Sequence, residues 1–303
     1  MKSPGERRKL LFVIHGARAD QPALRHLVTW VRDKGHSIDP RITWEKGDAE
    51  RFAREGAERG MDAVVAFGGD GTVNEVVNGL SGSKVPLGII PLGTANDFAR
   101  QTGIPEDVGQ AMDVILHHKP RQIDTAELNG RRFLNVSTGG VGAEATAETP
   151  LDAKETLGPL AYAITGMRKF AELRPYSGHF IGPRFELHTK FLLFAVSNGR
   201  MTGGGTLVTP KAHVTDGLLD VCIVEAQPRA DFAKLLLKVR KGEHLGEEGV
   251  HYTQIESMTI TTRRTVSVNL DGEPLSGKVL AYRARPRDLW VHLPHLPEEP
   301  EAT

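Results

Sequence analysis

The sequence contains a single cysteine, Cys222, so it cannot form an internal disulfide framework, which fits a reducing compartment. Without a second cysteine, and with no ligand spacing among the histidines, it contains no zinc-binding motif. Lys+Arg and Asp+Glu are equal at 38 each, so no global field attracts nucleic acid or an anionic membrane. No run approaches about 18 consecutive apolar residues, so we expect no transmembrane segment.

The first residues superficially resemble a secretory signal, because basic residues precede an apolar run. That apolar core spans only residues 10–14, shorter than the roughly 7–15 residues that such a signal needs. We therefore interpret it as a first β-strand and expect a cytoplasmic protein.

The first 125 residues alternate between strand and helix patterns. Apolar runs predict strands at KLLFVI, residues 37–43, DAVVAF and PLGIIPLG. Helices are expected at about 21–34, with Asp20 as N-cap, and at 48–59, closed by Gly60. This alternation predicts a Rossmann-like α/β domain whose parallel sheet is covered on both faces. Ligands of such sheets bind beyond the carboxyl ends of the strands.

From about residue 126 strands and turns dominate. TAELNGRRFLNVS is typical of a hairpin with an Asn-Gly turn, and further strand runs follow. Two helices are expected, at 159–171 and at 231–240; the first either packs on the core or lines a lipid entrance. We expect a mainly antiparallel β-sandwich over residues 126–282, and a first domain of residues 1–125 that residues 283–303 complete.

Residues 67–76 read FGGDGTVNEV and directly follow an apolar strand. Thr72 and Glu75 match a capping box, which predicts that a helix begins there. The arrangement recurs at PLGTANDF, where Thr94 is followed three residues later by Asp97. Two helix N-termini at one sheet edge offer N–H donors and partial positive charge to an anion.

Either glycine loop alone could be an ordinary turn, but the pair favours a phosphate site. The carboxylate of Asp70 cannot bind phosphate, because like charges repel. We expect it to bind a metal or water beside the phosphates. Asp97 is either a helix-capping carboxylate or a second acidic group near the metal.

The two glycine-loop motifs resemble those of a known enzyme family. GGDGTVNEVVNGL followed by PLGTANDFA closely resembles the catalytic domain shared by diacylglycerol, sphingosine, ceramide and bacterial lipid kinases. GGDGT alone is shared with NAD kinases and phosphofructokinases, whereas the second motif at this distance is more specific. ITWEKGDAERFA, STGGVGAEATAETP, NGRMTGGGTLVTPKAHVTDGLLDV and NLDGEPLSG are similar to the bacterial YegS-type lipid kinases. The similarity extends over nearly the whole chain.

The resemblance implies ATP-dependent phosphorylation of a lipid hydroxyl in a cleft between two domains. It implies phosphatidylglycerol as substrate, with diacylglycerol or another lipid as the alternative, and Mg²⁺ or Ca²⁺ as cofactor. The catalytic residues would be Glu273, as proton acceptor, and Asp70. The residues implied to bind ATP are Thr43, Gly69, Asp70, Gly71, Thr72, Val73, Asn74, Glu75 and Thr94. Those implied to hold the metal are Asp216 through its carboxylate and His213 and Leu218 through carbonyls.

Taken alone, the segments around Glu273 and Asp216 could be plain hairpin turns. A glutamate near its usual pKa of about 4.3 is a weak base for an alcohol, so the role of Glu273 as base would depend on a partly desolvated cleft that raises its pKa. A carboxylate flanked by carbonyls near Asp216 would suit a hard cation. The first loop, HGARAD, departs from its relatives, and contact of His15 or Arg18 with phosphate stays open.

Two other functions compete with a lipid kinase that reaches the membrane surface transiently. One is a kinase of a soluble substrate such as NAD, which shares GGDGT but not PLGTANDFA. The other is a nucleotide-binding protein without catalysis, against which the intact Asp70, Asp216 and Glu273 argue. Neither alternative involves nucleic acid.

Overall fold

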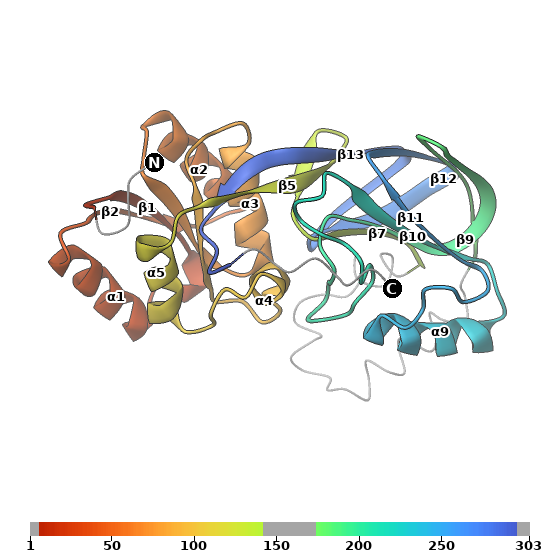
Figure 1. Cartoon of the computed structure of the whole chain (residues 1–303), viewed down its shortest axis with the longest axis horizontal. Coiled ribbons are helices and arrows are strands. Elements are labelled where there is room, and N and C mark those ends of the chain that lie inside the picture. Colours follow the sequence, from red (N-terminus) through yellow and green to blue (C-terminus); the bar gives the residue numbers. More distant parts are fainter. Residues whose placement is uncertain (1–5, 142–173, 296–303) are drawn as a thin grey trace.

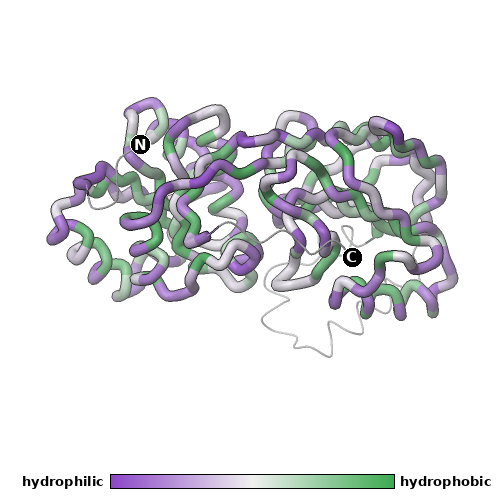
Figure 2. The backbone as a smooth tube through the Cα atoms, in the orientation of Figure 1, coloured by the Kyte–Doolittle hydropathy of each residue, from purple (hydrophilic) through white to green (hydrophobic). Residues whose placement is uncertain are grey.

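The computed structural model describes residues 6–141 and 174–295, which form two lobes connected by long strands (Figure 1). The helix expected at 159–171 lies outside these residues. Hydrophobic residues run through many strands inside both lobes, while hydrophobic and hydrophilic residues alternate along the helices (Figure 2). None of the described helices is both long and apolar enough to cross a membrane.

The first lobe is a parallel sheet in the order β4-β3-β1-β2. Its strands are β1 Lys9–His15, β2 Ser37–Thr43, β3 Ala63–Gly68 and β4 Leu87–Pro91. All of the residues of β3 and β4 are buried, as expected for strands covered on both faces. The α/β fold class is therefore confirmed.

The helices of this lobe cover both faces of the sheet (Figure 1). They are η1 Gly16–Arg18, α1 Pro22–Asp33, α2 Asp48–Glu58, α3 Asp70–Leu80, α4 Asp97–Gln101 and α5 Val108–His117. Helix α5 was not predicted; the side chain of Asp107 marks its start by accepting a hydrogen bond from the Gln110 N–H. The predicted start of the first helix was wrong, because its N-cap is Gln21 and not Asp20.

The second lobe is antiparallel, which confirms the mainly antiparallel β-sandwich class for this half. Its strands are β5 Arg121–Leu128, β6 Arg131–Phe133, β7 Val136–Gly140, β8 Tyr176–Gly182, β9 Phe185–Ser197, β10 Leu219–Glu225, β11 Val250–Ile255, β12 Ser257–Leu270 and β13 Glu273–Val291. The predicted Asn-Gly hairpin connects β5 and β6, with Asn129 and Gly130 both at positive φ. The helix expected at 231–240 is α9 Arg229–Lys241.

Strand β13 joins the two lobes. Its first part pairs with β12, and its later part pairs with β5. At its end Val291 pairs with Leu87 of β4, so the strand reaches the parallel sheet of the first lobe. The turn between β12 and β13 lies at the junction of the lobes (Figure 1). The domain boundary after residue 125 stays a prediction.

Candidate active site

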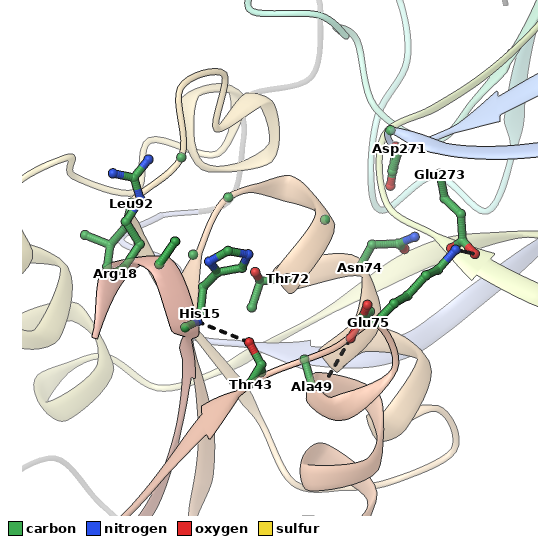
Figure 3. A pocket seen from close by; sticks show the side chains of 18 of the residues that line it. His15, Arg18, Thr43, Ala49, Thr72, Asn74, Glu75, Leu92, Asp271 and Glu273 are labelled. Carbon is green, nitrogen blue, oxygen red and sulfur yellow. Dashed lines mark hydrogen bonds and ion pairs between the residues drawn. The ribbon is translucent and has the colours of Figure 1, made fainter. Parts of the chain in front are cut away.

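A cavity of about 880 Å³ lies at the carboxyl ends of the parallel strands and is closed on one side by the β12–β13 turn (Figure 3). Its wall combines the ends of β1 and β2, the two glycine loops and the start of β13. The lining residues are His15, Gly16, Ala17, Arg18, Thr43, Trp44, Glu45, Lys46, Ala49, Gly68, Gly69, Gly71, Thr72, Asn74, Glu75, Leu92, Gly93, Thr94, Asp271, Gly272, Glu273 and Pro274. Groups that are distant in sequence therefore face one space.

The first glycine loop brings the N-terminus of α3 to this cavity. The predicted capping box is wrong, because the helix begins at Asp70 with Gly69 as N-cap and no side-chain cap. Thr72 is already inside the first turn, and the Glu75 carboxylate instead accepts a hydrogen bond from the Ala49 N–H at 3.2 Å. The N–H groups of the first turn still face the cavity side, which suits phosphate oxygens.

The second glycine loop packs directly on the first. A Cβ added to Gly93 would lie 2.5 Å from the Cα of Gly69, so only glycine permits this approach. The side chain of Asn96 closes the loop, accepting from the Gly93 N–H at 3.0 Å and donating to its carbonyl at 2.9 Å. The capping box predicted for Thr94 and Asp97 is also wrong, since Asn96 is the N-cap of α4 and its side chain makes no cap bond.

Asp70 lies beside the cavity and is not among the residues that line it. Its carboxylate accepts hydrogen bonds from the N–H groups of Asp97 and Phe98, at 3.2 and 3.4 Å, at the start of α4. Burial raises the pKa of Asp70, and the nearby Asp97 carboxylate adds to the shift against those hydrogen bonds. Asp70 therefore connects the two loops, while its role toward metal or water stays a prediction.

The Asp97 carboxylate accepts hydrogen bonds from the N–H groups of Gly204 and Gly205 at 2.9–3.1 Å. It does not cap its own helix with its side chain. It holds the glycine turn at 203–205, in which all three residues have positive φ. Asp97 thus fastens the α/β lobe to a loop of the β lobe.

Glu273 faces α3 from the start of β13 (Figure 3). Its carboxylate forms salt bridges with Lys46 at 2.8 Å and with Arg131 at 3.3 Å. Burial raises the pKa of Glu273, but these two cations outweigh it and hold the pKa below its ordinary value. The condition of a raised pKa is therefore not met, because Lys46 and Arg131, which lie far away in the sequence, are brought to the carboxylate by the fold.

Asp271 is a buried carboxylate in the same turn and was not among the predicted site residues. It accepts hydrogen bonds from the N–H groups of Leu134, Asn135 and Val136 at 2.7–3.2 Å. Burial raises its pKa to about 6, although these donors oppose the shift. The available signal was the Asp-Gly pair itself, in which Asp271 adopts a positive φ. Asp271 therefore locks the turn that carries Glu273 onto the chain entering β7.

The remaining residues that were predicted to bind ATP either line the cavity or lie in the hydrophobic core. Thr43 lines the cavity, and its hydroxyl accepts a hydrogen bond from the Gly16 N–H at 3.3 Å. Asn74 lines the cavity too, and its buried Oδ1 has no hydrogen-bond partner among the described residues. Val73 instead belongs to the buried core. His15 and Arg18, whose roles were open, both line the cavity (Figure 3).

The predicted metal residues lie together in the loop before β10, outside the cavity lining. The Asp216 carboxylate accepts the Leu218 N–H at 2.9 Å, and the His213 imidazole pairs with the Thr215 hydroxyl at 2.8 Å. Asp124 accepts the Gly217 N–H at 2.7 Å and fastens this loop to β5. Within the described residues no three His, Cys, Asp or Glu side chains converge on one point, so a cation here would depend on carbonyls.

Comparisons with known proteins agree with this geometry. The family model for the diacylglycerol kinase catalytic domain matches residues 9–128, and that for the YegS C-terminal NAD kinase beta sandwich-like domain matches residues 136–293. A protein of Pseudomonas aeruginosa named "Probable lipid kinase YegS-like" is 40% identical over 288 residues, which is 94% of each chain. One of Alcanivorax borkumensis with the same name is 37% identical over 292 residues, covering 95% of this chain and 97% of the relative.

A solved structure described as "a putative diacylglycerol kinase from Bacillus anthracis str. Sterne" superimposes with a TM-score of 0.79. It is 26% identical in sequence and covers 95% of each chain. The matching family model and the relatives define the chain as a phosphotransferase of the kinase class, and the glycine-lined cavity between an α/β lobe and an antiparallel lobe agrees with that class. The chain belongs to the family of YegS-like lipid kinases, as its motifs predicted. ATP is accordingly its co-substrate.

Proposed function

We propose that this enzyme transfers the γ-phosphoryl group of ATP to a hydroxyl of phosphatidylglycerol, which it reaches peripherally at a membrane surface. The observation that carries the proposal is that Glu273 and the N-terminus of α3 face one cavity from different lobes. The N-terminus suits phosphates, and the carboxylate suits an acceptor hydroxyl. The resemblance to YegS-type lipid kinases supports this acceptor.

The cavity residues fit ATP in two respects. A Cβ added to Gly71 would meet open space, so phosphate oxygens can approach the backbone there. The unpartnered Oδ1 of Asn74 is a buried acceptor that a hydroxyl or amino group of a nucleoside can satisfy. Lys46, Arg18 and His15 add donors around the same space.

In the reaction, the lipid hydroxyl oxygen forms a bond to the γ-phosphorus, and Glu273 accepts the hydroxyl proton as that bond forms. Because Lys46 and Arg131 keep the pKa of Glu273 low, the proton moves only once bonding to phosphorus has made the hydroxyl acidic. The bond from phosphorus to the ADP oxygen breaks, and ADP leaves with the electron pair. Lys46 and Arg131 orient the carboxylate. The Lys46 side chain remains 68% exposed, so it can also meet an anionic phosphodiester beside the acceptor hydroxyl. That charge favours phosphatidylglycerol over the neutral diacylglycerol.

Asp216, with the carbonyls of His213 and Leu218, is proposed to hold Mg²⁺ or Ca²⁺. A divalent cation bound to these oxygen ligands would supply positive charge, whereas the ligands themselves are negative or neutral. The loop of Asp216 does not line the cavity. We therefore propose that the cation bound there stabilises the loop next to Asp124.

Single-lipid vesicles test the acceptor. With labelled ATP, we expect label in phosphatidylglycerol at a rate at least about 10-fold above that in diacylglycerol, because only the former is anionic at its head group. Phosphatidylcholine vesicles and free NAD are the negative controls. Preferential labelling of diacylglycerol would replace the substrate, and labelling of NAD would overturn the assignment to lipid.

Asp216→Asn tests the cation site. We expect the Mg²⁺ or Ca²⁺ concentration for half-maximal activity to rise by about 10-fold or more, because the amide lacks the ligand charge. Cation titrations of the kinase activity measure this. Asp231→Asn on α9, whose carboxylate pairs with Lys234 at 3.2 Å, is the matched control. Identical titrations for both variants would argue against the site.

A further inference from the structure

Trp44 is the most exposed large hydrophobic residue in the described chain, at 88% of its surface. It lines the cavity and directly follows Thr43 at the end of β2. The other two tryptophans, Trp30 and Trp290, are half-buried. A tryptophan side chain without a packing partner at the mouth of a binding cavity leaves a large flat aromatic face available.

The loop that carries Trp44 is held in place by the buried Asp48. One carboxylate oxygen accepts hydrogen bonds from the N–H groups of Trp44, at 2.8 Å, and Glu45, at 3.2 Å. The other oxygen forms a salt bridge with Arg51 at 2.6 Å. The exposed indole therefore extends from a fixed backbone, and little conformational entropy is lost there when a ligand packs on it.

The surroundings favour a nucleobase over a lipid surface. The cavity that Trp44 lines also contains the α3 N-terminus, where triphosphate would bind, and the unpartnered Oδ1 of Asn74. The charged Glu45 and Lys46 directly follow the tryptophan, and nearby in sequence only Ile42, at 39%, is another exposed large hydrophobic residue. Insertion into a membrane would need a wider apolar surface.

We propose that Trp44 is a specificity-determining residue whose indole stacks on the purine ring of ATP. The inference rests on the proposed use of this cavity for ATP. Aromatic stacking tolerates any base but is stronger for the larger purine ring, so Trp44 would favour ATP over CTP. Because the ring contacts the base alone, it adds nothing to the binding of triphosphate.

Calorimetric titration of the protein with ATP and with inorganic tripolyphosphate separates the contribution of the base to binding from that of the phosphates. In Trp44→Leu we expect the Kd for ATP to rise about 10-fold or more, while the Kd for tripolyphosphate stays within about 2-fold. Trp44→Phe keeps a ring and is expected to retain most of the affinity for ATP. In the wild type, ATP but not tripolyphosphate should quench tryptophan fluorescence, and Trp44→Phe should lose that quenching.

An unchanged Kd for ATP in Trp44→Leu would overturn the inference. So would a loss of binding to phosphatidylglycerol vesicles with ATP affinity intact, since Trp44 would then contact lipid. A wrong assignment of the lipid substrate would give a different result. The wild type would then leave phosphatidylglycerol unlabelled, while ATP binding would still depend on Trp44.

Discussion

Replacing Glu273 by glutamine is expected to lower kcat for phosphoryl transfer by about 100-fold or more, with little change in the Kd for ATP. The amide keeps the size of the side chain but cannot accept the proton of the acceptor hydroxyl. Labelled-phosphate transfer to phosphatidylglycerol vesicles measures kcat, and calorimetry measures ATP binding. The matched control is Glu50→Gln, because Glu50 also bonds Arg131, at 2.5 Å, but does not line the cavity.

The pH profile gives an independent readout of the same residue. Since Lys46 and Arg131 hold the pKa of Glu273 below its ordinary value, its carboxylate is already ionised above about pH 5. No loss of kcat from this group is therefore expected between pH 8 and pH 5. In Lys46→Met the pKa should rise, and the acidic limb should move to higher pH. Full activity in Glu273→Gln, or an equal loss in Glu50→Gln, would contradict the role of Glu273.

Asp271→Ala is expected to lower the free energy of unfolding by about 3 kcal/mol or more and to reduce kinase activity with it. Three N–H groups, those of Leu134, Asn135 and Val136, lose their acceptor, and each unsatisfied buried donor costs roughly 1–3 kcal/mol. The turn that positions Glu273 would lose its connection to β7. Urea denaturation measures the first effect. Asp271→Asn keeps one acceptor oxygen and tolerates the positive φ, so it should be less damaging.

The same carboxylate makes stability depend on pH. Burial raises its pKa from the ordinary 3.8 to about 6, so between these values the folded state binds more protons than the unfolded state. The contribution of Asp271 to the free energy of unfolding should therefore fall as pH rises from about 4 to about 6. Denaturation at several pH values should show that decline in the wild type and a smaller one in Asp271→Asn. Parallel curves would refute a raised pKa.

Much of the fold followed from local patterns. Strands β1 to β4, helices α1 and α2, and the Asn-Gly hairpin were predicted, because hydrophobic period and turn chemistry are decided within a few residues. Helix α5 was missed although Asp107 caps it. The capping boxes at Thr72 and Thr94 were wrong because the side chains near both helix starts bond elsewhere. Glu75 accepts a hydrogen bond from the Ala49 N–H, and α3 has Gly69 as N-cap without a side-chain cap. At α4 the N-cap Asn96 bonds the backbone of Gly93 instead of capping the helix.

By itself the sequence determined the alternation of strands β1 to β4 with helices α1 and α2, the paired glycine loops and the kinase family, since motifs are contiguous. The tertiary structure alone decided what the charged groups do. Asp70 binds the start of α4 across 27 residues, and Glu273 meets Arg131 across 142. A pKa depends on solvent exclusion and on nearby charges, and both come from segments that only folding brings together. For the same reason the exposure of Trp44 and the burial of Asp271 could not be read from the sequence.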